Sequence, residues 1–352
     1  MKPYTIGDKP LPGYTLGRFI GQGGFGRVWQ CKAPGGAPVA LKIIDLKEGQ
    51  GIKEFSAIRL FKSVRHANLV PITGFWLKDA YDNLISDTES AGTVTLMNKA
   101  SELLIVMAIC DKSLTDRLHE CRKQGEESIP SAELMDYMLD AARAIDFLNS
   151  PRHDLSGGPV AIQHCDIKPQ NILLVGGSVQ LCDFGLARVL SDTSKPADAS
   201  VSAYYTAPEM LSESKPSKST DQYSLAITYY EMRTGDLPFD ARLPAAVLGA
   251  HLQGRLDFVK VSPEERKVLK KATSLDPESR FPTTMDMVLE LRRIVLPHAP
   301  FLASPTQELP SLKTATSEHS VIAKPRTKLG LWLGIALVLL ITLCLSGYFL
   351  FR

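Results

Sequence analysis

His164-Cys165-Asp166-Ile167-Lys168-Pro169-Gln170-Asn171 and the later triplet Asp183-Phe184-Gly185 say more about the fold than any other part of the chain. A lysine follows Asp166 after two residues and an asparagine after five, and a second aspartate precedes a glycine. Groups of this kind can orient a hydroxyl and hold metal-bound phosphates. The two stretches therefore predict phosphoryl-transfer machinery.

A glycine-rich stretch lies near the start of the chain. Gly21-Gln22-Gly23-Gly24-Phe25-Gly26-Arg27-Val28 matches the pattern Gly-x-Gly-x-x-Gly-x-Val, in which missing Cβ atoms let backbone N–H groups approach phosphates. Dinucleotide-binding folds have a similar pattern, but a helix follows it there. Here β-prone residues and then Val39-Ala40-Leu41-Lys42 follow, so the context favours a phosphate loop between two strands.

In this order along the chain, these motifs resemble those of the eukaryotic-type protein kinase family. The resemblance covers residues 14–296 and implies an α+β, bilobal protein-kinase fold. A small β-rich lobe is expected up to about Met107 and a larger helical lobe beyond it. The resemblance also implies ATP and Mg²⁺ as cofactors and protein Ser or Thr hydroxyls as acceptors, because Lys168 is typical of Ser/Thr-directed members.

The resemblance implies a role for each matching residue of the catalytic loop. Asp166 is expected to accept the proton of the substrate hydroxyl or to orient that hydroxyl. Lys168 is expected to neutralise the transferring phosphoryl group. Asn171 and Asp183 are expected to bind the Mg²⁺ ions that bridge the phosphates.

Nucleotide binding is expected at the junction of the lobes. By resemblance, Lys42 binds the α- and β-phosphates, and Glu54 is the best candidate to hold this lysine in place. Glu54 lies about one helical turn further from His66 than the family pattern expects, so either its helix carries an extra turn or Lys42 has another partner. The expected nucleotide contacts are Gly21, Gln22, Gly23, Gly24, Phe25, Gly26, Val28, Ala40, Lys42, Glu54, Met107 as gatekeeper, and the backbone of Ala108 and Cys110.

Cys165 stands where the family commonly has an arginine that pairs with a phosphate on the activation segment. Cysteine cannot form that pair. We therefore expect activity that does not depend on phosphorylation of residues 185–207. The alternative is a pseudokinase, a nucleotide-binding scaffold that performs no chemistry. Two features support this alternative: Cys165 and the unusual distance of Glu54 from His66.

Several residues are expected to support the site without touching substrate. By resemblance, Glu209 pairs with Arg280, and Asp221 braces the catalytic loop from a central helix. His164 is expected to support the loop backbone and not to carry protons. A helix is expected to open at Ser131 with that serine as its N-cap.

Residues 329–351, LGLWLGIALVLLITLCLSGYFLF, contain no charged side chain. At about 1.5 Å of rise each they reach roughly 34 Å, enough for a hydrocarbon core of about 30 Å. Lys324, Arg326 and Lys328 precede the stretch and only Arg352 follows it. The excess of positive charge predicts a single-pass C-terminal transmembrane helix in the cell membrane, with the kinase-like domain in the cytoplasm.

The remaining features complete this organisation. Residues 297–328 are rich in Pro, Ser and Thr and are expected to form a juxtamembrane linker. Gly330 and Gly334 form a small-xxx-small pair that permits a homodimer. The architecture resembles that of bacterial receptor-type Ser/Thr kinases.

Composition excludes some classes of partner and site. The formal net charge of +2 does not favour nucleic acid as the main partner. The six cysteines contain no Cys-x-x-Cys pair, which argues against a zinc site or a disulfide framework.

Overall fold

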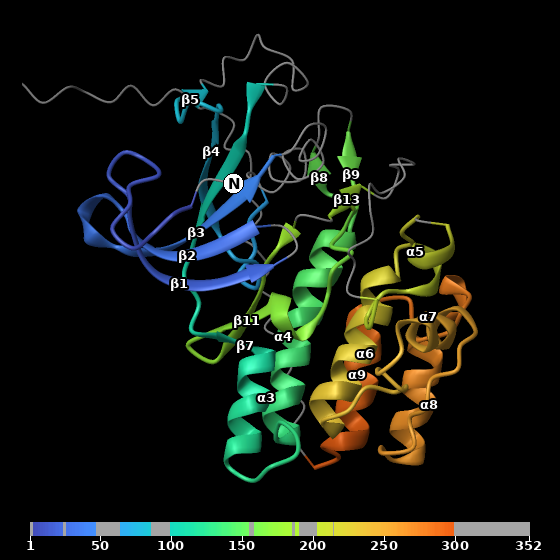
Figure 1. The fold of residues 1–352 in the computed structure, drawn as a ribbon. Coiled ribbons are helices and arrows are strands. Elements are labelled where there is room, and N and C mark those ends of the chain that lie inside the picture. Colours follow the sequence, from blue (N-terminus) through green and yellow to red (C-terminus); the bar gives the residue numbers. More distant parts are fainter. Residues whose placement is uncertain are drawn as a thin grey trace, which may run out of the picture. The chain divides into compact units, whose positions relative to one another are not determined.

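The structure is a computed structural model that describes residues 3–23, 26–46, 64–85, 99–154, 158–184, 187–189, 203–213 and 215–298. All of these residues belong to one unit, Met1–Ala299. Its first part is rich in strands and its second part in helices, as Figure 1 shows. The change falls after Met107, the last residue of strand β6, as the sequence predicts.

Antiparallel strands form the sheet of the small lobe in the spatial order β1-β2-β3-β6-β4-β5. Their bounds are β1 Thr15–Gly23, β2 Gly26–Lys32, β3 Pro38–Asp45, β4 Ile72–Lys78, β5 Leu84–Ile85 and β6 Glu102–Met107. The sequence predicts strands at residues 14–20, 27–31, 39–44 and 103–107, and these correspond to β1, β2, β3 and β6. Strand β4 escapes prediction because its sequence, ITGFWLK, shows no regular alternation of apolar and polar residues.

Strands β3 and β6 supply apolar side chains to both faces of this sheet, since successive residues of a strand point to opposite sides. Ile44, Leu103 and Ile105 belong to the main core on one face. The other face carries a second core made of Tyr4, Leu11, Leu16, Trp29, Cys31, Leu41, Ile43, Leu104 and Val106.

The chain before Tyr14 is part of the small lobe. Tyr4 is only 6% exposed and Leu11 only 1% exposed, and both pack in the second core. The Tyr4 hydroxyl donates a hydrogen bond to Glu102 Oε2 at 2.6 Å, and the Arg27 guanidinium lies 5.7 Å from the Tyr4 ring centroid. Residues 3–13 therefore cover the face of the sheet that points away from the large lobe's core.

Helices dominate the large lobe. Their bounds are α3 Leu114–Lys123, α4 Ser131–Asn149, α5 Pro208–Ser212, α6 Thr220–Thr234, α7 Pro244–Leu252, α8 Pro263–Ala272 and α9 Thr284–Val295. Helices α4, α6 and α9 lie side by side (Figure 1), and α6 is buried along most of its length. This burial makes α6 a rigid platform for the loops around it.

The predicted N-cap of α4 is wrong by one position. Ser131 is the first helical residue, and Pro130 occupies the N-cap position without a side-chain hydrogen bond. The physical reason is that the Leu134 N–H donates to the Pro130 carbonyl at 2.9 Å, which closes the first turn one residue earlier.

Short strands and 3₁₀ turns frame the loops of the large lobe. A three-stranded sheet contains β7 Lys112–Ser113, β11 Ile172–Val175 and β12 Ser178–Leu181. Two small pairs join β8 His153–Asp154 to β9 Pro159–Val160, and β10 Ile162–Gln163 to β13 Arg188–Val189. In the described part of the large lobe, the 3₁₀ turns are η2 Pro169–Asn171 and η4 Pro277–Ser279, and a further one, η1 Pro34–Gly36, joins β2 to β3 in the small lobe.

The segment Asn68-Leu69-Val70 ties the small lobe to strand β12. The Val70 N–H donates to the Leu181 carbonyl at 2.9 Å, and the Leu181 N–H donates to the Asn68 carbonyl at 2.9 Å. Asn68 Nδ2 also donates to the Val179 carbonyl at 2.9 Å. Because Asp183 follows β12 by two residues, these bonds fix its position relative to β3.

Some predictions fall on residues outside the described ranges. Gly24, Phe25 and Glu54 lie there, as do most of the linker and the predicted membrane span, 329–351. Among the residues that are described, no helix has both the length and the apolar character needed to cross a bilayer.

Candidate functional site

Asp166 lies at the centre of a buried cluster in the catalytic loop, next to the turn η2. Asn171 Nδ2 donates to the backbone carbonyl of Asp166 at 2.9 Å and to its Oδ2 at 2.8 Å. Lys168 Nζ lies 2.9 Å from the same Oδ2. The structure thus brings Lys168 and Asn171 to the carboxylate of Asp166, the third predicted catalytic residue, which is 6% exposed.

The environment of Asp166 changes its acidity. Burial raises the pKa of Asp166 to about 6, while the Lys168 ammonium acts in the opposite direction. A carboxylate with this pKa remains mostly ionised at neutral pH but is a stronger base than an exposed aspartate. This suits a group that accepts or orients a hydroxyl proton.

Lys42 and Asp183 form the second buried cluster. Lys42 Nζ lies 2.7 Å from Asp183 Oδ1. Burial alone would raise the pKa of Asp183, but the charge and hydrogen bond of Lys42 outweigh it and hold the pKa below its usual value. Asp183 adopts a left-handed backbone conformation, with φ of +64°. Such a conformation costs energy and tends to occur at functional sites.

Backbone and side-chain bonds join the two clusters. The Cys182 N–H donates to the Asn171 carbonyl at 3.0 Å, and His164 Nε2 lies 3.0 Å from the Cys182 carbonyl. His164 is fully buried, and burial lowers its pKa to about 4, so the ring is neutral and Nε2 acts as the donor. His164 therefore supports the loop backbone, as predicted.

Asp221 of α6 holds the start of the catalytic loop. Its Oδ2 accepts from the His164 N–H at 2.8 Å, and its Oδ1 accepts from the Cys165 N–H at 2.8 Å. Cys165 has a φ of +62°, so this brace stabilises a strained turn. Burial raises the pKa of Asp221 to about 6, and the two N–H groups oppose the shift. The predicted bracing contact is confirmed.

Residues of β2, β3 and β6 share the face that carries Lys42. In the register of the sheet, Val28 pairs with Lys42 and Ala40 pairs with Met107. The Ala108 N–H donates to the Pro71 carbonyl at 3.1 Å, so only its carbonyl is left to contact a base. A cavity at this face is lined by Lys42, Ile44, Val70, Ile72, Ile105, Met107, Cys182, Asp183 and Phe184.

The two cysteines near this cavity are protonated. Burial raises the pKa of Cys110 to about 11 and raises that of Cys182 well above its usual value. Because thiolates are the strong nucleophiles, burial disfavours the reactive form of both side chains.

The glycine loop has a structural requirement besides its predicted contact with phosphates. Gly26 has a φ of +124°, and a Cβ atom there would lie 2.2 Å from the Ile43 carbonyl oxygen. Gly21, by contrast, has open space where a Cβ would be. Backbone packing against β3 therefore demands glycine at 26 but not at 21.

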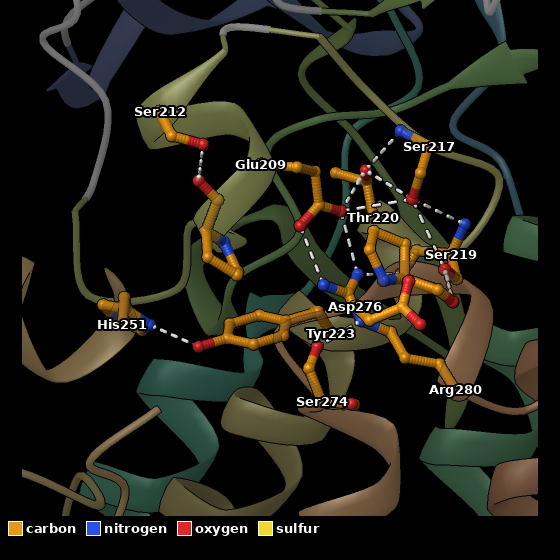
Figure 2. Close-up of polar contacts among 12 residues, drawn as sticks. Glu209, Ser212, Ser217, Ser219, Thr220, Tyr223, His251, Ser274, Asp276 and Arg280 are labelled. Atoms are coloured by element: carbon orange, nitrogen blue, oxygen red, sulfur yellow. Dashed lines mark hydrogen bonds and ion pairs between the residues drawn. The ribbon is translucent and has the colours of Figure 1, made fainter. Parts of the chain in front are cut away.

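Glu209 and Arg280 form the predicted ion pair. Arg280 Nη1 and Nη2 lie 2.8 and 2.7 Å from the two carboxylate oxygens, and the Arg280 side chain is fully buried (Figure 2). Bidentate geometry of this kind is the strong form of such a pair. Around this pair lie contacts that the sequence does not predict, involving Tyr204, Tyr223 and His251. They join residues too far apart in the chain to form a recognisable motif.

Comparison with known proteins agrees with this geometry. The family described as protein kinase domain matches residues 14–290. The chain belongs to the protein kinase family. The kinase domain is 28% identical over 233 residues to the serine/threonine-protein kinase TIO of Arabidopsis thaliana, covering 64% of this chain and 15% of that protein.

Two further relatives are also serine/threonine-protein kinases by name. The LRR receptor-like serine/threonine-protein kinase FEI 2 of Arabidopsis thaliana is 29% identical over 263 residues, 73% of this chain and 39% of that protein. PrkC of Bacillus subtilis is 34% identical over 139 residues, 37% of this chain and 22% of that protein. The chain thus spans well under half the length of these relatives.

The kinase family uses ATP and Mg²⁺, and the donor set here fits both. Asp183 and Asn171 offer the carboxylate and amide oxygens that Mg²⁺ prefers. Lys42 supplies a buried cation suited to phosphate oxygens. The bilobal fold and the eukaryotic-type Ser/Thr kinase relationship expected from the sequence are confirmed.

Proposed function

We propose that this chain transfers the γ-phosphoryl group of Mg-ATP to Ser or Thr hydroxyls of proteins. The observation that carries the proposal is the meeting of two buried clusters, Asp166 with Lys168 and Asn171, and Lys42 with Asp183. The Cys182–Asn171 backbone bond holds them together. The side chains that could act as a general base, as a phosphate ligand and as metal ligands are therefore close together.

Each residue has a role in this proposal. Asp183 and Asn171 hold Mg²⁺, which neutralises charge on the phosphates. Lys42 binds the α- and β-phosphates, with Glu54 as its proposed partner. Lys168 stabilises the transferring group, and Asp166 orients the attacking hydroxyl. The glycine loop covers the phosphates, and Val28, Ala40, Met107 and the backbone of Ala108 and Cys110 contact the base.

The test uses the full-length chain in detergent micelles with γ-labelled Mg-ATP and a generic basic protein. Asp166→Asn is expected to reduce labelling by about 100-fold or more, because a positioned base contributes about 10²–10⁴-fold. Acid hydrolysis of the labelled protein should release phosphoserine or phosphothreonine. Equal labelling by both forms, with nucleotide binding retained, would favour the pseudokinase scaffold.

The proposal includes activity without phosphorylation of the activation segment. It is supported by Cys165, whose buried thiol donates to the Gln163 carbonyl at 3.7 Å and offers no positive charge to a phosphate. Phosphatase-treated enzyme should keep the turnover of untreated enzyme. Loss of turnover on treatment, restored by autophosphorylation, would refute this part.

We also propose that residues 329–351 anchor the kinase in the cell membrane with its domain in the cytoplasm, tethered by the linker 297–328. The uncharged stretch and the preceding basic residues support this. One relative, FEI 2 of Arabidopsis thaliana, is a receptor-like kinase by name, which also supports a membrane location. Alkaline extraction should leave the chain in membranes, and Leu339→Arg should release it. The Gly330–Gly334 pair supports a homodimer through this helix, so Gly334→Ile should reduce cross-linking between two copies of the chain.

A further inference from the structure

Residues 3–13, which we call the strap, are bound by their backbone to β1, the edge strand of the small-lobe sheet. The Gly7 N–H donates to the Leu16 carbonyl at 2.8 Å, and the Leu16 N–H donates to the Asp8 carbonyl at 2.8 Å. The Thr5 N–H donates to Asp8 Oδ2 at 2.7 Å and closes a tight turn beside these bonds. The side chain that precedes the turn therefore has a defined position on the face of the sheet that carries the second core.

Tyr4, the residue before this turn, connects two strands that are not neighbours in the sheet. Its hydroxyl donates to Glu102 Oε2 at the start of β6 at 2.6 Å, and its ring centroid lies 5.7 Å from the Arg27 guanidinium of β2. Strand β3 lies between these two strands. An aromatic ring attracts a guanidinium at this distance, and more strongly where water is excluded, as around Tyr4, which is 6% exposed. Tyr4 therefore holds Arg27 to the sheet by a contact that strand pairing does not supply.

The hydroxyl of Tyr4 fixes the direction of its ring. Burial raises the pKa of Tyr4, the hydrogen bond and charge of Glu102 raise it further, Asp82 acts in the same direction, and Arg27 opposes them. The hydroxyl is therefore protonated and is a donor to the Glu102 carboxylate. Glu102 is itself 6% exposed, and a buried carboxylate is costly without a donor. This bond thus keeps the ring in place beside Arg27.

Arg27 lies at the base of the hairpin that carries the glycine loop. It directly follows Gly26, and in the register of the sheet it pairs with Gln22 of β1. The next residue, Val28, pairs with Lys42 of β3. Strands β1 and β2 lie side by side in Figure 1. A contact that holds Arg27 to the sheet therefore also holds the base of the loop that we propose covers the phosphates.

We propose that Tyr4 is a positioning residue for ATP. Its ring holds Arg27 to the sheet and so keeps the glycine loop in the position in which the loop backbone meets the phosphates. A loop that is fixed in advance loses less conformational freedom when the nucleotide binds, so the contact increases the affinity for ATP. The inference rests on the proposed kinase function, and it gives Tyr4 no contact with ATP itself.

The test measures Kd for Mg-ATP by calorimetry in the full-length chain in detergent micelles. Tyr4→Leu fills the core without an aromatic face, and Kd should rise about three- to tenfold, the range expected for one cation–π contact. Tyr4→Phe keeps the face and loses only the hydroxyl, so Kd should stay within about twofold of the wild type while the melting temperature falls. Should Tyr4→Leu fail to fold, Arg27→Met carries the test, because it removes the cation of the same contact and should raise Kd by the same factor.

The double variant Tyr4→Leu/Arg27→Met isolates the contact between the two side chains. If both act through this contact, the double variant should have about the same Kd as either single variant. A Kd that rises by the product of the two single effects would show that the residues act independently and would overturn the inference.

Leu11→Ala is the matched control. Leu11 is a buried residue of the same strap and the same core, so its truncation should lower the melting temperature and leave Kd for Mg-ATP unchanged. A rise in Kd as large as that of Tyr4→Leu would show that the strap acts only through stability, and this would overturn the inference. Unchanged Kd in folded Tyr4→Leu and Arg27→Met would overturn it too. Because Kd is measured without transfer, a wild type that binds Mg-ATP but lacks Asp166-dependent labelling would overturn the proposed function alone.

Discussion

Lys42 and Asp183 lie 141 positions apart in sequence and meet at 2.7 Å, Nζ to Oδ1. The lysine comes from β3 of the small lobe, and the aspartate follows β12 of the large lobe. Their side chains are 9% and 24% exposed, so each charge partly compensates the other where water has little access. The pair joins the lobes at the place where we propose that the phosphates bind.

Lys42→Met should reduce both catalytic activity and the stability of the fold, and the two losses can be measured separately. Loss of the ammonium is expected to reduce kcat by about 100- to 1,000-fold, as for other single groups that stabilise developing charge. Breaking a buried pair costs about 3–5 kcal/mol, and the low end applies here because Asp183 is partly exposed. Without Lys42 the pKa of Asp183 should rise, since the lysine is what holds it down. Kinetics and thermal melting measure the two effects.

Lys78→Met is the matched control for this substitution. Lys78 is also a buried lysine of the same sheet, but its partner is Asp82, which is 45% exposed and can be hydrated. Activity per folded molecule should stay within about twofold of the wild type. A comparable loss of activity in both variants would show that Lys42 acts through the stability of the lobe.

Asp166 should give the reaction an acid limb near pH 6, because burial raises its pKa to about 6 and only the ionised form is a base. Lys168 opposes that shift, so Lys168→Gln should move the limb to higher pH. The measurement is kcat/KM for the protein substrate between pH 5 and 8 in both forms. Protonation of ATP itself affects the pH profiles of the wild type and of Lys168→Gln equally, so it cancels in the comparison. A limb at the same pH in both would contradict the coupling of Lys168 to Asp166.

The same pKa affects stability with a definite sign. The folded-state pKa of about 6 exceeds the unfolded value of 3.8, so the folded state favours the protonated carboxyl. The unfolding free energy therefore falls as pH rises from about 4 through 6, by up to about 3 kcal/mol. Asp166→Asn, a neutral isostere, should melt at a higher temperature than the wild type at pH 7.5 and at a similar temperature at pH 4.

Short motifs allow the residues of the proposed catalytic site to be located from the sequence. Asn171 follows Asp166 by five positions, and this short separation lets the Asn171 side chain donate a hydrogen bond to the Asp166 carboxylate. Lys42 can be predicted because it lies in a strand pattern that comes after the glycine loop. The Glu209–Arg280 pair is recognisable because each residue lies in its own family motif.

Contacts made only by tertiary packing escape such prediction. Tyr204, Tyr223 and His251 lie on a loop and two helices, and nothing in their separate surroundings indicates that they meet. Tyr4 and Leu11 lie in a stretch rich in polar residues, Pro and Gly, which has no periodicity of its own. Their burial depends on a sheet face that exists only after the lobe has formed.

Asp221→Ala should impair both folding and catalysis. It leaves the N–H groups of His164 and Cys165 without their acceptor, at a cost of about 2–5 kcal/mol for the two. Because the loop of Asp166 then loses its brace, kcat should fall by about 100-fold. Denaturant titration and steady-state kinetics measure the two effects.

Asp146→Ala provides the comparison. Asp146 also accepts two backbone N–H bonds, from Thr284 and Met285 at 2.9 Å each, but at the start of α9 and away from the site. It should lose a similar amount of stability while the folded fraction keeps wild-type kcat. Equal losses of kcat in both variants would argue against a specific role for Asp221.

The segment before Tyr14 should behave as part of the small-lobe core. Leu11 is 1% exposed among the residues of the second core, so Leu11→Ala should reduce the unfolding free energy by about 2–5 kcal/mol. Ile6, in the same segment, is 74% exposed, and Ile6→Ala should change it by no more than about 0.5 kcal/mol. Neither residue approaches the site, so folded molecules of both variants should keep wild-type KM for ATP. Equal stability of the two variants would contradict the burial of Leu11 in the second core, whereas the expected difference would show that this segment contributes to the stability of the small lobe.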